Sequence, residues 1–312
     1  MAGPFTHMLV CQAAQHSLPS LPRQILAANE CFLLLGSVSP DLASVSDKVH
    51  GTNWSDRMHD GSLNRLVVPI FQDLKTAHCR DARIAWLFGY VAHIVADVVV
   101  HPVVRLSLKH PGRDGQHQRS EITTDTLLFS AIKTWPLKSA DFLGWLKECN
   151  DDANRPMYLQ TMATWSRCLK QVEPNFDKPT EDPLGGGQSG PFGGSCSDWF
   201  AWYVHGVEGA SEIPRWFFGY NYLYPRVNQI SAEDRRDFFD DVTLPLPSGA
   251  NGEYRTNVFD RAVSHLSSIW QQMWTRLLAA DSGGIDDLIP DWDLNSGTNR
   301  TTGRDFDLWM TA

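Results

Sequence analysis

Five side chains that can bind a metal ion recur at helical spacing in one part of the chain. His93, Asp97 and His101 follow one another at intervals of four residues, and His117 and Glu121 are also four residues apart. At about 100° per residue, the first three fall within roughly 80° of one another on a helix, and the last two within roughly 40° on a second helix. Two helix faces can therefore direct these side chains at one metal cluster.

The residues between the first three are Ile, Val and Ala, which predicts that this helix is buried. Buried imidazole and carboxylate groups need partners to offset their lost hydration. Zinc commonly binds His together with Asp or Glu and leaves a coordination position for water. The pattern favours a zinc site, and the alternative is a set of core histidines and helix-capping carboxylates that bind no metal.

Helical periodicity dominates the rest of the chain and predicts a mainly α protein. Helices are expected near Pro4, at 20–35 with an end at Gly36, at 62–78, 81–104, 139–149, 156–172 and 256–280, and around His117 and Glu121. Residues 42–61 are expected to form an ordered loop. No repeat or linker is evident, so residues 1–312 are predicted to form a single multi-helical domain, with a flexible Gly-rich loop at 183–196 and an irregular C-terminal tail at 281–312.

Composition and charge narrow the function. The chain is 42% hydrophobic, which is ordinary for a globular protein, and its net charge of −9 makes nucleic acid an unlikely partner. The run 86–104 is apolar enough to resemble a membrane span, but it carries the metal-binding side chains and Pro102. It is therefore interpreted as a central buried helix, and no transmembrane segment is expected.

The first residues and the cysteines suggest a location. The N-terminus lacks a basic region followed by an apolar stretch and a small-residue cleavage site, so no secretory signal is predicted. The six cysteines form no CxxC pair and are expected to be isolated thiols of a reducing compartment. The expected location is the cytoplasm, or outside the cell after export by a signal-independent route.

The motifs together resemble those of the zinc-dependent phospholipase C family, which is related to the S1/P1-type nucleases. The resemblance rests on HxxxDxxxHP at 93–102 and HxxxE at 117–121, and it extends upstream to 3–7, 35–41 and 56–59. The segments arrive in the family's order. The resemblance implies a multi-helical fold with three zinc ions in a cleft.

The first zinc set that the resemblance implies is His59, His93 and Asp97, with Asp41 as a further ligand or as a base beside it. His50 is an alternative to His59, because both histidines follow Asp41. His59 is favoured because its sequence context is similar to that of the family's loop histidine.

The second implied set is His101, His117 and Glu121. The third is similar to a clip formed by an N-terminal residue, an early histidine and a bridging aspartate. Here these are His7, Asp97 and Ala2, whose amine becomes available if Met1 is removed. The implied cofactor is therefore Zn²⁺, as two or three ions.

The chemistry implied is hydrolysis of a phosphodiester by a zinc-bound hydroxide, with Asp41 as the residue that orients or deprotonates the attacking water. With a glycerophospholipid at a membrane surface, the products are diacylglycerol and a phosphorylated headgroup. The function predicted from the resemblance is that of a phospholipase C.

Two positions bear on the choice of headgroup. Phosphocholine-cleaving members of the family place aromatic residues where this chain has Leu42 and Asp56. Trp54 could supply an aromatic face from elsewhere, and Asp56 could pair with an ammonium headgroup such as ethanolamine. Both residues are candidates for substrate binding.

Two alternatives remain open. The same zinc centre could serve a nuclease or nucleotidase, which would need aromatic surfaces on which bases stack. A protein without catalytic activity could use zinc for stability and its aromatic C-terminal region to bind a lipid surface or a partner protein.

Overall fold

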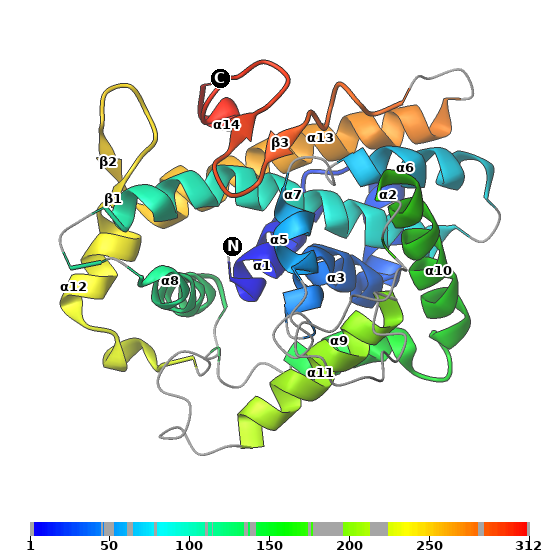
Figure 1. Cartoon of the computed structure of the whole chain (residues 1–312), viewed down its shortest axis with the longest axis horizontal. Coiled ribbons are helices and arrows are strands. Elements are labelled where there is room, and N and C mark those ends of the chain that lie inside the picture. Colours follow the sequence, from blue (N-terminus) through cyan, green and yellow to red (C-terminus); the bar gives the residue numbers. More distant parts are fainter. Residues whose placement is uncertain are drawn as a thin grey trace, which may run out of the picture.

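One long helix, α7 (Asp81–Ser107), runs through the middle of the molecule (Figure 1). In this computed structural model, every residue of the helix from Ala82 to Val104 is buried. Among the described residues it is the one helix long and apolar enough to cross a membrane, and the stretch that meets this criterion is entirely buried in the protein. The prediction of a central buried helix is therefore confirmed.

The structure describes residues 3–44, 46, 53–60, 65–77, 80–109, 112–113, 115–133, 137, 142–173, 176, 196–212, 224–279 and 284–310. The Gly-rich loop predicted at 183–196 lies outside these residues except for Cys196, and so do Ala2 and His50.

Helix α3 (Glu30–Val38) packs closely against α7, and two glycines make this contact possible. A Cβ atom at Gly36 would lie 2.0 Å from the backbone oxygen of Trp86, and one at Gly89 would lie 2.0 Å from the backbone oxygen of Leu33. Only glycine, which has no Cβ, permits this approach.

The prediction of one helix over 20–35 that ends at Gly36 is wrong. The chain forms α2 (Ser20–Ala28) and α3 with a break at Asn29, and Gly36 lies inside α3. A glycine near a helix end resembles a C-terminal cap in sequence, whereas here it serves helix packing.

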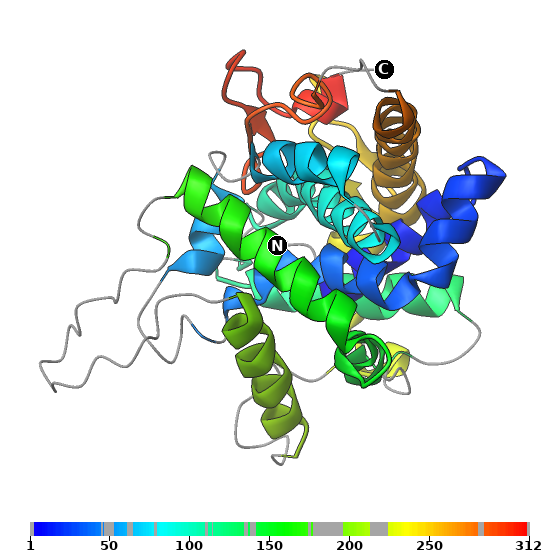
Figure 2. The same cartoon turned by 90° about the vertical axis from the view of Figure 1, so that its right-hand side faces the viewer.

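Other helices surround α7 on several sides. Helix α13 (Asp260–Leu278) lies along one side, and α1 (Pro4–Gln15) lies with α3 on another (Figures 1 and 2). The indole Nε1 of Trp270 in α13 donates a hydrogen bond to the backbone oxygen of Phe88 at 3.0 Å. Helices α6 (Val67–Thr76) and α10 (Arg155–Val172) also pack on α7.

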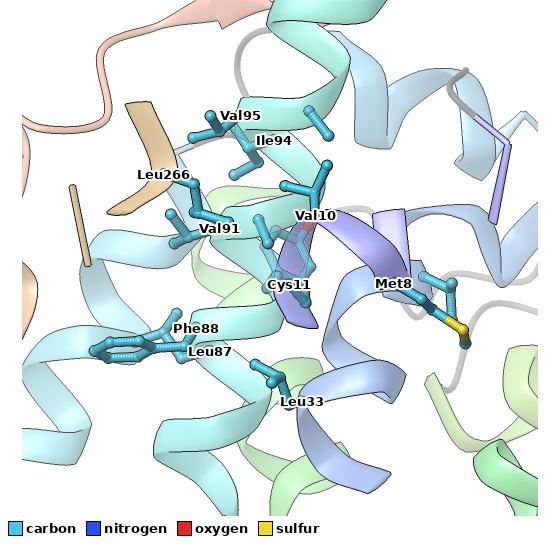
Figure 3. Close-up of a cluster of buried hydrophobic side chains, with 14 of the residues drawn as sticks. Met8, Val10, Cys11, Leu33, Leu87, Phe88, Val91, Ile94, Val95 and Leu266 are labelled. Carbon is cyan, nitrogen blue, oxygen red and sulfur yellow. The ribbon is translucent and has the colours of Figure 1, made fainter. Parts of the chain in front are cut away.

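These helices share a hydrophobic core that draws side chains from both ends of the described chain. Figure 3 shows part of it, where side chains of α1, α3, α7 and α13 meet: Met8, Val10, Cys11, Leu33, Leu87, Phe88, Val91, Ile94, Val95 and Leu266. The mainly α fold class is confirmed.

The region expected to be an ordered loop contains a short helix, α5 (Trp54–His59). Trp54 and Met58 of this helix are buried, so its stability comes from packing rather than from intrinsic helix propensity. The remaining helical elements are η1 (Ser39–Asp41), α8 (His117–Ile132), α9 (Phe142–Lys147), η4 (Glu148–Asn150), α11 (Cys196–Glu212), η6 (Val227–Gln229), α12 (Ala232–Arg235), η7 (Arg236–Asp240), η8 (Tyr254–Phe259) and α14 (Asp307–Met310).

Short strands occur only late in the described chain. Strands β1 (Val242–Thr243) and β2 (Asn251–Gly252) form one antiparallel pair. Strands β3 (Trp292–Asp293) and β4 (Thr298–Asn299) form a second pair within the segment expected to be irregular. We call residues 292–299 the C-terminal hairpin; it packs on α7 through the buried residue Leu294 and through Gly297.

Candidate metal centre

Five buried polar side chains, on α7 and on the elements beside it, face one another, and we call them the inner group. They are His7 of α1, Asp41 of η1, His59 of α5, and His93 and Asp97 of α7. None is more than 7% exposed. Their donor atoms form two overlapping sets of three, each within 4.8 Å: His7, His93 and Asp97, and Asp41, His59 and His93.

Asp97 lies at the centre of this group. Its Oδ1 is 3.4 Å from the Nε2 atoms of His7 and His101, and its Oδ2 is 3.3 Å from Nε2 of His59 and 3.2 Å from Nε2 of His93. Each carboxylate oxygen therefore faces a different pair of histidines, and the contacts with His93 and His101 agree with the helical spacing of 93, 97 and 101.

Backbone carbonyl groups fix the orientation of three of these rings. His59 Nδ1 lies 2.6 Å from the oxygen of Ser55, and His93 Nδ1 lies 2.9 Å from that of Ser37. His101 Nδ1 lies 2.6 Å from the oxygen of Leu294. Since a carbonyl oxygen only accepts, each Nδ1 carries a proton, and each ring in its neutral form directs the lone pair of Nε2 at the cluster.

The Nε2 atoms of His59 and His93 lie only 3.2 Å apart. Two lone pairs at this distance repel each other unless a proton or a cation lies between them. His7 is fully buried, and neither of its ring nitrogens makes a hydrogen bond within the described part of the chain. Imidazole nitrogens and carboxylate oxygens form the donor set that zinc prefers, so these residues fit the ion.

The electrostatics of the inner group also favour a cation. Burial lowers the pKa of His59, but the hydrogen bonds and charges of Asp41 and Asp97 raise it to about 10. Burial raises the pKa of Asp97, and the neighbouring histidines hold it well below its usual range. Burial, together with the nearby His93, lowers the pKa of His7 to about 3, so this ring is neutral. A proton on His59 thus partly balances two buried carboxylates.

The chain positions His7 through the start of α1. Pro4 occupies the first turn, where its missing N–H costs nothing. Asp125 of α8 accepts hydrogen bonds from the backbone N–H groups of Phe5 and Thr6 at 3.1 and 2.8 Å, from the Thr6 hydroxyl at 2.6 Å and from the Tyr224 hydroxyl at 2.9 Å. A buried carboxylate therefore caps this helix and holds it against α8.

Three further side chains form what we call the outer group: His101 of α7, and His117 and Glu121 of α8. Their donor atoms lie within 4.8 Å of one another, and His117 Nε2 is 2.8 Å from Glu121 Oε1. His101 is buried, whereas the His117 side chain is 43% exposed and that of Glu121 15%. This group is therefore open to solvent on one side.

The two substrate-binding candidates occupy different surroundings. Trp54 is buried, with its ring 5.3 Å from that of Phe176 and 5.9 Å from that of Trp199, and the guanidinium of Arg57 lies 4.9 Å above its face. Asp56 is exposed on the same helix, three residues before His59. A role in substrate binding stays a prediction for both residues.

The structure also brings in groups that the sequence did not indicate. The backbone oxygens of Ser37, Ser55 and Leu294 orient the histidines, but main-chain groups leave no signature in residue types. One of these contacts could have been predicted: if residues 54–59 had been expected to be helical, the i, i+4 spacing would have placed the Ser55 carbonyl near His59.

Comparison with known proteins gives one match. A family model described as zinc dependent phospholipase C matches residues 6–176. This stretch contains every side chain of the inner and outer groups and leaves out α13 and the C-terminal hairpin. No curated protein and no solved structure matches the chain.

Proposed function

The chain belongs to the zinc-dependent phospholipase C family, and from this premise we propose that it hydrolyses glycerophospholipids at a membrane surface to diacylglycerol and a phosphorylated headgroup. The observation that carries the proposal is Asp97, whose two oxygens face two pairs of histidines beside a second buried carboxylate. A cluster of this kind suits an anionic phosphodiester, because it would hold several cations close together.

Two or three zinc ions are proposed for the two groups. His59, His93 and Asp97 would hold one ion, with Asp41 as a further ligand or as a base beside it, and His101, His117 and Glu121 would hold another. His7 and Asp97 would hold a third, together with Ala2 if its amine is free. Bound zinc supplies charge neutralisation for the phosphodiester and lowers the pKa of water.

Asp41 is proposed to orient the attacking water and to accept its proton. Burial raises the pKa of Asp41, and the charges of His93 and His59 lower it below its usual value, so the carboxylate is ionised at neutral pH. Its Oδ1 lies 3.3 Å from His59 Nε2, which places it at the edge of the inner group. Water adds its oxygen to phosphorus, and the diacylglycerol oxygen leaves with a proton.

The test couples metal content to turnover on the untagged full chain. Zinc per chain is measured by elemental analysis, and headgroup release is measured from vesicles that mix choline, ethanolamine and serine phospholipids, with and without chelator. Two or three zinc ions and chelator-sensitive release are expected. Asp41→Asn should lower kcat far more than it lowers zinc content, because the zinc-binding histidines remain.

Other outcomes would contradict the proposal. Zinc with hydrolysis of single-stranded nucleic acid or nucleotides, and none of phospholipid, would indicate a nuclease-type enzyme. Zinc without turnover of either substrate, together with loss of structure on chelation, would indicate a structural metal.

A further inference from the structure

The C-terminal hairpin lies against both metal-binding groups. Leu294 is fully buried, and its backbone oxygen accepts the hydrogen bond from His101 Nδ1 at 2.6 Å. Its backbone N–H donates to the backbone oxygen of His59 at 3.1 Å. One residue therefore touches a member of the outer group and a member of the inner group.

The hairpin is fixed to α7 at the turn that follows Asp97. Pro102 has no backbone N–H, so the oxygen of Val98 lacks its usual helical donor. Gly297 packs at this position with φ +69°, and a Cβ there would lie 2.7 Å from both the Val98 oxygen and the Pro102 ring. Just beyond the hairpin, Trp309 Nε1 donates to the oxygen of Val99 at 2.9 Å.

Side chains join the hairpin to α5 as well. The guanidinium of Arg300 lies 2.5 Å from Asp60 Oδ1, at the end of α5, and 3.2 Å from Asp293 Oδ2 in β3. Asp307 accepts hydrogen bonds from Trp292 Nε1 and Asn299 Nδ2, which holds the two strands together. The Leu294 carbonyl is thus held in place from several directions.

We propose that the C-terminal hairpin is a positioning element of the metal centre, in which the Leu294 carbonyl holds His101 with Nε2 directed at the outer-group zinc. The inference rests on the proposed zinc centre. It goes beyond that centre because the hairpin lies outside the stretch that the family model matches and holds none of the side chains proposed as ligands. Hydrogen-bond partners of zinc-binding histidines typically change metal affinity by about 10- to 100-fold when they are lost.

A matched pair of variants tests the hairpin. Gly297 and Gly303 have nearly the same φ, +69° and +67°, but a Cβ at Gly303 would meet nothing within 4 Å. Gly297→Ala and Gly303→Ala therefore impose similar backbone strain, and only the first pushes the hairpin away from α7. Zinc affinity of the full chain is measured by competition with a chromophoric chelator.

We expect Gly297→Ala to weaken one zinc site by about 10- to 100-fold and Gly303→Ala to leave all sites unchanged. A second readout begins with the wild-type protein, where it does not depend on how well the variants fold. The His101 Hδ1 proton, observed by NMR in histidine-labelled wild-type protein, should resonate downfield because it is hydrogen-bonded, and it should move upfield in Gly297→Ala.

Equal zinc affinity in the two variants, or a wild-type His101 ring without a hydrogen-bonded Hδ1, would overturn the inference. Failure of the proposed function would give a different set of results. Phospholipid would not be hydrolysed, but the downfield His101 resonance and the difference in zinc affinity between the two glycine variants would still be observed. The two failures are therefore distinguishable.

Discussion

The inner and outer groups use the same residue types but differ in exposure and in support. All five inner side chains are buried, and they come from four elements of the first part of the chain, with the last of the five at residue 97. The outer group has one buried member, His101, and two partly exposed ones at the start of α8. The inner group is therefore built as part of the core, whereas the outer group is open to solvent.

The largest expected effect comes from the carboxylate that touches both groups. Asp97→Asn removes the charge that faces His7, His59, His93 and His101, and breaking such a buried charged set typically costs about 3–5 kcal/mol. Zinc content, chemical unfolding and turnover are measured on the same preparation, and all three should fall.

Asp240→Asn is the control for this variant. Asp240 pairs with Arg235 at the surface, so its loss should change unfolding by no more than about 1 kcal/mol. Full zinc content in Asp97→Asn would show that the two groups do not share this residue.

Zinc release should separate the groups. With excess chelator, wild-type protein should lose zinc in a fast phase from the outer group and a slow phase from the inner group, because His117 is exposed and the inner histidines are not. His117→Ala should remove the fast phase and leave the slow one, whereas Gln118→Ala should change neither. A single phase of zinc release in the wild type would show that the two groups do not differ in accessibility.

Asp125 joins the helix of the outer group to the helix that carries His7, and its ionisation should make this link depend on pH. Burial raises the pKa of Asp125 to about 6, although the hydrogen bonds from Thr6, Tyr224 and the backbone act to lower it. The folded chain therefore holds the proton more tightly than the unfolded chain. This contribution to stability is complete below about pH 4 and is lost as pH rises through about 6, a change of about 3 kcal/mol.

Urea unfolding of the chelator-treated chain between these pH values measures this effect. Asp125→Asn keeps a hydrogen-bond acceptor but does not titrate, so its unfolding free energy should depend less on pH than that of the wild type by the same amount. Identical pH dependence in the two proteins would show that Asp125 is not responsible.

The smallest effect concerns the headgroup. If Asp56 binds an ammonium group, Asp56→Ala should lower ethanolamine phospholipid hydrolysis relative to choline phospholipid by roughly twofold to fivefold, as expected for an exposed charge pair. Asp152→Ala is the control, because Asp152 is an exposed carboxylate outside α5. An equal change in both variants would indicate a general loss of surface charge.

Local spacing made part of this site predictable. Residues four apart on a helix share a face whatever surrounds them, so His93, Asp97 and His101 could be placed together before the fold was known. The same rule places His117 beside Glu121. The family resemblance added His7, Asp41 and His59, which come from separate elements.

Other features depended on partners that are distant in sequence. Gly36 has a packing role because Gly89 lies opposite, 53 residues away in the chain. Helix α5 is stabilised by the burial of Trp54 and Met58, which composition does not show. The role of the Leu294 carbonyl could not be predicted from the sequence, because every residue has a backbone carbonyl.

The distances along the chain between these partners set an order of assembly. The acceptors for His59 and His93 lie 4 and 56 residues from their histidines, whereas the acceptor for His101 lies 193 residues later. As the chain leaves the ribosome, the inner group has its carbonyl partners long before the outer group does. Contacts of such long sequence separation form late, so His101 gains its carbonyl partner only when the end of the chain has folded back.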